Sequence, residues 1–345
     1  MNNLPLGKLS PEFLASLLRR YTHTDERVLV GASIGEDATI IDFGTTYLAA
    51  KTDPITFATD EIGWYAVHVN ANDIAVCGGV PRWFLATILL PEAQTDERLV
   101  EDIFRQLSEA CEQVGIVLCG GHTEVTYGLD HPIVVGQMLG EVAPDRLVRS
   151  GGGRPGDDLL LSKGIAIEAT AIIARERGDD LAARYSEAFL ARCRNMLHKP
   201  GISVLREARL AVEALPCGAI HAMHDPTEGG LATGVWEMAA ASQTGVWLDG
   251  DALPVLLETR TLCTEFGLDP LGVIASGALL VALDPAYTSQ LLKLWQAEGI
   301  AGAVIGRLTG AEEGMVLSQG GSRHPLPRFR RDEIARLYED AGKRC

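Results

Sequence analysis

The chain has 345 residues, of which 47% are hydrophobic and 22% charged, as in an ordinary globular protein. That length exceeds what one hydrophobic core usually organises, so we expect two domains. The formal net charge of −16 argues against a nucleic-acid-binding protein, because clustered Lys and Arg hold polyphosphate backbones. With no apolar run of roughly 20 residues and no export signal, a cytoplasmic protein without membrane association is expected.

The cysteines and the local distribution of charge narrow the possible classes of protein further. The seven cysteines are scattered and odd in number, which is typical of reduced thiols and does not indicate a disulfide framework or a zinc site. The segment 318–345 departs from the general acidity, with seven Arg or Lys against four Asp or Glu. It is a candidate for contact with an anionic partner or a phosphate, although a solvated surface has the same composition.

In the first half, short β-like runs at 28–30, 39–41 and 47–50 are separated by Gly and Asp, which predicts a sheet with carboxylates at its strand ends. Apolar residues from 62 onward have helical spacing until the glycines at 78 and 79. We then expect a strand at 82–90, an amphipathic helix from Thr95 to Gly115, and strands at 116–119 and 133–142.

The run Gly-Gly-Gly-Arg-Pro-Gly-Asp at 151–157 is the strongest break in the pattern, so we place the domains at 1–150 and 151–345. A strand is expected at 158–162 and helices at 167–177 and 185–197. The apolar stretch 273–283 is interpreted as a buried strand. Mixed helices and strands in both halves predict α+β, or open α/β, domains.

The first half carries four acidic motifs that we interpret as turns supplying hard oxygen ligands. Mg²⁺ and a polyphosphate held through it require such ligands. Neither a P-loop nor the glycine triplet of dinucleotide-binding folds is present. Taken singly, each motif is more often a plain turn or a helix cap. The motifs are Gly35-Glu36-Asp37, Lys51-Thr52-Asp53, Asn70-Ala71-Asn72-Asp73 and Gly120-Gly121-His122-Thr123-Glu124.

The second half contains one comparable motif, His-Asp-Pro-Thr-Glu-Gly-Gly-Leu at 224–231, which leads directly into a helical pattern. Asp225 or Thr227 can cap that helix, and the glycines let a ligand approach its free N–H groups. An anion site and an ordinary capped helix are equally compatible with these residues. His221 and His224 are interpreted as capping or packing residues and not as ligands of a transition metal.

Together these motifs resemble the aminoimidazole ribonucleotide synthetase-like (PurM-like) superfamily, and within it the hydrogenase-maturation branch called HypE. The carriers are G-E-D-A at 35–38, T-D at 52–53, A-N-D-I-A-V-C-G-G-V-P at 71–81, G-G-H-T-E at 120–124, G-D at 156–157 and D-P-T-E-G-G-L at 225–231. The resemblance implies a two-domain α+β fold. Its N-terminal mixed sheet pairs with a second subunit into a barrel, and ATP lies between the domains.

The resemblance also implies roles for individual residues. The expected metal ligands, for Mg²⁺, are Asp37, Asp53, Asp73 and Asp225. The expected ATP-binding residues are Asp37, Lys51, Asp53, Asn72, Asp73, Glu124, Asp225, Thr227, Gly229 and Gly230. Cys345, Asp73 and Glu124 are the expected catalytic residues.

Cys345, the last residue, connects the chain to the reaction of the HypE branch. There a C-terminal thiolate receives a carboxamide from a carbamoyltransferase, ATP phosphorylates the carboxamide oxygen, and loss of phosphate leaves a thiocyanate. The expected partners are therefore ATP, a carbamoyltransferase or another maturation protein, and a second copy of the chain.

Several features depart from the HypE pattern, and three of them bear on the chemistry. Glu228 stands where HypE has Arg, Ser276 stands where HypE has the acidic residue that deprotonates the carboxamide, and Gly-Lys-Arg precedes Cys345 in place of Pro-Arg-Ile. Two other functions therefore stay open. One is a small-molecule kinase or ATP-dependent synthetase of the same superfamily, similar to thiamine monophosphate kinase, and the other is a non-catalytic ATP-binding partner protein.

Overall fold

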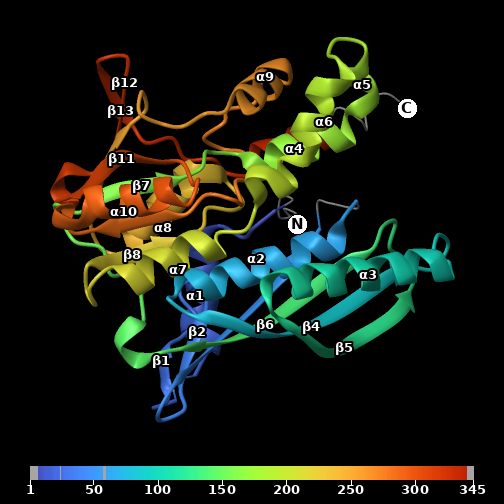
Figure 1. Ribbon diagram of the computed structural model, residues 1–345, viewed down its shortest axis with the longest axis horizontal. Coiled ribbons are helices and arrows are strands. Elements are labelled where there is room, and N and C mark those ends of the chain that lie inside the picture. Colours follow the sequence, from blue (N-terminus) through green and yellow to red (C-terminus); the bar gives the residue numbers. More distant parts are fainter. Residues whose placement is uncertain (1–6, 24, 57–59, 340–345) are drawn as a thin grey trace. The chain divides into compact units, whose positions relative to one another are not determined.

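The computed structural model describes residues 7–23, 25–56 and 60–339 (Figure 1). These residues form two compact units, each containing helices and a sheet. The N-terminal unit consists of the described residues of 24–31 and 37–147. The C-terminal unit consists of those of 1–23, 32–36 and 148–345, so the beginning of the chain belongs to it.

The N-terminal unit is built on a six-stranded sheet in the order β1-β2-β3-β6-β4-β5. Neighbouring strands are antiparallel except β4 and β5, which are parallel and joined by helix α3 (Glu97–Val114), as a crossover requires. The strands are β1 (Val28–Val30), β2 (Thr39–Asp42), β3 (Tyr47–Ile55), β4 (Val80–Pro91), β5 (Val117–Thr126) and β6 (Ile133–Val142). A 3-10 turn, η1 (Pro144–Arg146), ends this unit.

Helices α2 (Ile62–Val76) and α3 pack side by side on this sheet (Figure 1). Helix α3 begins where the Asp96 side chain accepts the Leu99 N–H at 2.8 Å and ends at Gly115, whose φ of 71° places it in the left-handed region. Its apolar stripe faces inward and its charged residues face solvent. The amphipathic helix expected here is confirmed.

Helix α2 differs because it is buried on all sides: Trp64 is its one residue that is not buried. Its polar side chains, Asn70, Asn72 and Asp73 among them, therefore have to find partners inside the protein. This requirement positions the candidate site described below.

The C-terminal unit contains a seven-stranded sheet in the order β13-β12-β9-β11-β7-β10-β8, antiparallel except for the β12–β9 pair. Its strands are β7 (Asp158–Ser162), β8 (Ile220–His224), β9 (Gly245–Asp249), β10 (Leu280–Leu283), β11 (Gly302–Thr309), β12 (Met315–Gln319) and β13 (Ser322–Pro325). The helices are α1 (Pro11–Tyr21), α4 (Ile167–Glu176), α5 (Gly178–Ala182), α6 (Glu187–Asn195), α7 (Leu205–Ala214), α8 (Gly230–Ala241), α9 (Leu257–Glu265), α10 (Pro285–Ala297) and α11 (Arg336–Glu339), with short turns η2 (Leu197–Gly201), η3 (Ala311–Glu313) and η4 (Glu333–Ala335).

The core of the C-terminal unit lies between this sheet and its helices. Leu161 on β7, Val235 on α8 and Leu326 after β13 belong to one cluster of buried side chains. Helices α7, α8 and α10 pack on the sheet, while α4, α6 and α9 contact one another (Figure 1). The predicted two-domain α+β architecture is therefore confirmed.

The interpretation of 273–283 as a single strand is wrong. Only Leu280–Leu283 is a strand, and the residues before it form a buried loop that contains Gly277 at a φ of 117°. Side chains satisfy part of this loop's backbone: Asp332 accepts the N–H of Ile274, and Glu168 accepts that of Ser276. An apolar run can thus remain buried without strand pairing when buried carboxylates accept its N–H groups.

None of the helices in the described part of the chain has the length and apolarity needed to cross a membrane.

We predict that Leu161→Ala will destabilise the protein by about 2 to 5 kcal/mol, because the truncation leaves a cavity in the centre of the C-terminal core. Leu257→Ala is the matched control, since Leu257 is 67% exposed and its truncation should change stability by less than about 0.5 kcal/mol. Denaturant unfolding measures both effects. Equal stabilities of the two variants would contradict the assignment of the core.

Candidate functional site

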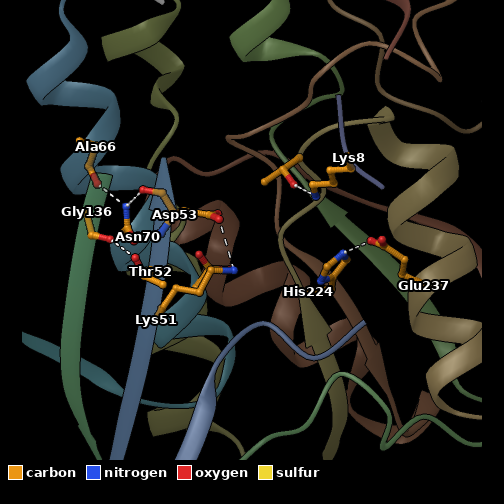
Figure 2. Close-up of polar contacts among 11 residues, drawn as sticks. Lys8, Lys51, Thr52, Asp53, Ala66, Asn70, Gly136, His224 and Glu237 are labelled. Carbon is orange, nitrogen blue, oxygen red and sulfur yellow. Dashed lines mark hydrogen bonds and ion pairs between the residues drawn. The ribbon is translucent and has the colours of Figure 1, made fainter. Parts of the chain in front are cut away.

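Lys51, on β3, lies at the centre of the first group of candidate residues. Its ammonium Nζ is 3.0 Å from Asp73 Oδ1 on α2 and 3.6 Å from Asp53 Oδ2 on its own strand. Figure 2 shows Lys51 and Asp53 side by side on β3, with the Lys51 ammonium turned toward the Asp53 carboxylate. The structure therefore brings together three of the residues that the sequence nominated.

The carboxylates of this group stabilise the positive charge of Lys51. Burial by itself would lower the pKa of the Lys51 ammonium, but the carboxylates of Asp73, Asp53 and Asp37 outweigh burial and raise it above its usual range. Asp37 is also buried and belongs to the same unit. Lys51 is thus a permanent cation that holds carboxylates from separate segments close together.

Asn70 fixes the backbone of β3 beside this cation. Its Oδ1 accepts the N–H of Asp53 at 2.9 Å, and its Nδ2 donates to the carbonyls of Asp53 at 3.2 Å and Ala66 at 2.9 Å (Figure 2). Thr52 donates to the carbonyl of Gly136 on β6 at 2.8 Å. Asn70 belongs to the motif at 70–73 but is not among the site residues that the sequence nominated. Its position among the apolar residues of a helical pattern was the signal in the sequence that it would be buried, and the structure shows it fully buried.

Three of the four acidic motifs interpreted as turns are regular structure. Residues 51–53 continue strand β3, because antiparallel pairing with β6 extends to Ile55. Residues 70–73 lie inside α2, and residues 120–124 inside β5. The motif at 35–37 alone lies outside helices and strands. Pairing with neighbouring strands outweighs the turn preference of Gly and Asp at 51–53 and 120–124. Residues 70–73 continue the helical spacing that begins at residue 62.

The remaining candidates of this unit lie in different environments. Asn72 is fully buried on α2. Glu124, on the edge strand β5, is half exposed and lies 3.2 Å from the ring Nε2 of His122. Glu124 is therefore not part of the Lys51 group as the structure describes it.

In the C-terminal unit, β8 is followed by Asp225, Thr227 and Gly229, and Gly230 is the first residue of α8. Asp225 is buried. Gly229 and Gly230 have φ values of 82° and 69°, in the left-handed region that favours glycine. A Cβ on Gly230 would lie 2.4 Å from the carbonyl of Leu271, so this glycine is required by close packing of the protein on itself.

The amides at this helix start already have acceptors within the protein. Gly229 N–H donates to Asp332 Oδ2 at 2.7 Å, Gly230 N–H to the carbonyl of Thr227, and Ala232 N–H to that of Leu271. Lys8, from the beginning of the chain, donates from Nζ to Thr227 Oγ1 at 3.2 Å (Figure 2). Lys8 and Asp332 lie far from the motif in sequence, and no local pattern identified them.

Two buried carboxyl groups stabilise the loop beside α8. Asp332 accepts three backbone N–H groups, and Glu168 on α4 accepts the N–H of Ser276 at 3.2 Å. Burial raises the pKa of Glu168 to about 7 and that of Asp332 to about 6, although their N–H donors act in the opposite direction. The residue at position 276 is a serine and has no carboxyl group, but the carboxyl group of Glu168 contacts its backbone N–H.

His221 and His224, both in this unit, contact carboxylates. His221 Nδ1 lies 2.8 Å from Asp157 Oδ1, and both side chains are buried. His224 Nε2 lies 3.3 Å from Glu237 Oε2 on α8 (Figure 2). Cys345, the expected acceptor of the carboxamide, lies outside the residues that the structure describes.

Residues 35–142 match the N-terminal domain of AIR synthase related protein, and residues 154–317 match the C-terminal domain. The chain belongs to the AIR synthase related family. The carbamoyl dehydratase HypE of Azotobacter vinelandii is 31% identical over 78% of this chain and 77% of that protein. The selenide, water dikinase of Nitratidesulfovibrio vulgaris (strain DSM 19637 / Miyazaki F) is 33% identical, covering 82% of each chain.

Among solved structures, hydrogenase maturation protein HypE in complex with ATP is similar to this chain with a TM-score of 0.71. The two are 25% identical, and the similarity covers 95% of this chain and 98% of that one. The resemblance inferred from the motifs is therefore confirmed for the family and for its HypE-like branch.

We predict that Glu168→Gln will flatten the dependence of stability on pH. Because the folded pKa of about 7 lies above the ordinary 4.5, the folded state binds the extra proton, and stability falls as pH rises between those values. The variant should lose this fall, most visibly above the pKa of Asp332, about 6. Denaturant unfolding across the pH range measures it, with exposed Glu101→Gln as control. A profile identical to that of the native protein would contradict the assignment.

Proposed function

We propose that this chain is an ATP-dependent enzyme of the HypE type, which dehydrates a carboxamide carried on its own C-terminal cysteine to a thiocyanate for hydrogenase maturation. The observation that carries the proposal is the similarity to carbamoyl dehydratase HypE over more than three quarters of both chains. The similarity to HypE in complex with ATP supports ATP as the co-substrate.

In this proposal the Cys345 thiolate carries the carboxamide received from a carbamoyltransferase. The carboxamide oxygen attacks the terminal phosphorus of ATP, and ADP leaves. The nitrogen then loses both of its protons and the phosphorylated oxygen leaves as inorganic phosphate, which forms the C≡N triple bond of the thiocyanate. Cys345 supplies the sulfur throughout, while Asp73 and Glu124 are the proposed catalytic carboxylates.

The Lys51 group supports a proposal of Mg²⁺ binding by Asp37, Asp53 and Asp73. Its carboxylate oxygens are the hard ligands that Mg²⁺ prefers, and Lys51 limits their mutual repulsion before the ion arrives. Bound Mg²⁺ would neutralise charge on the transferring phosphate. Asn72 and Glu124 are proposed neighbours of the nucleotide, and Asp225, Thr227, Gly229 and Gly230 are proposed for the phosphate side, with Asp225 as a further ligand of the ion.

A homodimer is part of the proposal and rests on the edge of the N-terminal sheet. Strand β5 pairs with β4 and with no second strand among the described residues, and it carries exposed apolar side chains at Val117 and Val125, 56% and 57% exposed. A second copy would cover this edge, which soluble proteins rarely leave open. We propose the cytoplasm as the site of action because the scattered cysteines suit reduced thiols.

A second candidate function is phosphoryl transfer to a small acceptor, favoured by the 33% identity to a selenide, water dikinase. The two functions differ in where the phosphate is accepted. The HypE type modifies Cys345, whereas a small-molecule kinase turns over without it.

We predict that Asp73→Asn will weaken Mg²⁺-dependent ATP binding by about tenfold or more, because it removes a proposed ligand and a partner of Lys51. Calorimetric titration with ATP in the presence and absence of Mg²⁺ measures the effect. Asp102→Asn, on the exposed side of α3, is the control and should bind as the native protein does. Metal-independent affinity, unchanged in Asp73→Asn, would contradict the proposed role.

We predict that Cys345→Ala will abolish modification of the C-terminal peptide while leaving ATP binding intact. Mass spectrometry after incubation with ATP, carbamoyl phosphate and a carbamoyltransferase should show a carbamoyl adduct that loses water in the native protein. Cys217→Ala, at an exposed cysteine, should behave as native. ATP turnover with an added metabolite that persists in Cys345→Ala would favour the small-molecule kinase.

A further inference from the structure

The C-terminal unit contains a pocket of about 560 Å³, a volume typical of small-molecule sites. Three segments form its wall: residues 8–12 at the beginning of the chain, residues 228–237 at the start of α8, and residues 327–332 of the basic C-terminal segment. We call it the Trp236 pocket. The segment singled out in the sequence for its positive charge thus contributes to a concave site.

One wall of the Trp236 pocket combines flat aromatic surface with the positive charge of an arginine. The guanidinium carbon of Arg328 lies 4.2 Å from the centre of the Trp236 ring, a cation–π arrangement. Arg328 also lies 3.4 Å from Glu12, which holds the guanidinium in place. Leu9, 37% exposed, and Phe329 add apolar surface. Such a wall favours a ligand with a planar or apolar part.

The acidic side chains of the pocket are already engaged. Glu12 contacts Arg328, Glu228 accepts the backbone N–H of Lys8 at 3.3 Å, and Glu237 lies 3.3 Å from His224. Both oxygens of Asp332 accept backbone N–H groups. The pocket's carboxylates are therefore poorly placed to attract a cationic ligand.

Arg330, by contrast, lines the pocket, is exposed, and forms no ion pair with any residue that the structure describes. A guanidinium presents a fork of N–H donors that matches a phosphate or a carboxylate. An anionic group is thus the complement of this side chain.

We propose that the Trp236 pocket binds a small organic anion that carries a planar or apolar part next to a phosphate or carboxylate group. Arg330 binds the anionic group, and the wall formed by Trp236, Arg328 and Phe329 binds the planar part. Because Glu228 and Gly229 line the pocket, the ligand lies at the start of α8, next to the segment proposed for phosphate binding. The inference holds whichever of the two functions above is correct.

The test is calorimetric titration of the full-length protein with 1-naphthyl phosphate, compared with inorganic phosphate and with 1-naphthol. We expect naphthyl phosphate to bind more tightly than either part alone. Arg330→Ala should weaken its binding by about tenfold, the effect of one lost charge-assisted hydrogen bond. Trp236→Leu should weaken naphthyl phosphate and naphthol but not inorganic phosphate.

Arg323→Ala is the matched control, because Arg323 is exposed on β13 and does not line the pocket. It should bind naphthyl phosphate as the native protein does. Equal losses in Arg323→Ala and Arg330→Ala would overturn the proposal, as would naphthyl phosphate binding no tighter than inorganic phosphate. Thermal unfolding of Trp236→Leu confirms that it is folded before titration.

Titration in the presence of saturating Mg²⁺ and ATP tests whether the Trp236 pocket is distinct from the nucleotide site. We expect naphthyl phosphate to bind with the same stoichiometry when ATP is present. Full displacement by ATP would mean that the pocket is part of the nucleotide site and would overturn the inference while leaving the proposed function standing. Conversely, Asp73→Asn should lose ATP affinity and keep affinity for naphthyl phosphate.

Discussion

The ion pair between Lys51 and Asp73 is the interaction on which the candidate site of the N-terminal unit depends. It joins the middle of strand β3 to the last turn of helix α2, and Asp53 lies beside it. An ionised group buried without a partner costs several kcal/mol, so the ion pair stabilises both Lys51 and Asp73 in their buried positions. Helix α2 is buried on nearly every side, so its few polar side chains need partners inside the protein.

The C-terminal unit also buries ionisable groups, among them two carboxyl groups near α8. These two, Asp332 and Glu168, have backbone amides as their partners. Asp332 receives N–H groups from the start of α8, from the loop before β10 and from its own turn η4, so a single side chain joins three segments. The Asp332 carboxyl therefore supplies negative charge at the positively polarised start of α8.

These two arrangements affect function differently. Around Lys51, one cation compensates several carboxylates, whose oxygens are the ligands that the proposed Mg²⁺ site needs. Near Ser276, the carboxyl of Glu168 has a pKa of about 7 and can change protonation near neutral pH. A carboxyl group therefore lies at the backbone of Ser276, supplied by helix α4.

The sequence by itself determined many of the elements, the two-domain α+β architecture and the family. Apolar periodicity and glycine positions are local properties, and the motifs from Gly35 to Leu231 are local strings. It did not determine the conformation of the acidic motifs, because strand pairing with β6 and burial of α2 are long-range effects. Only the tertiary structure showed that Lys8 and Asp332 bind the start of α8 and that Arg330 faces a pocket. Contacts between residues more than 100 positions apart depend on chain packing, which no local pattern contains.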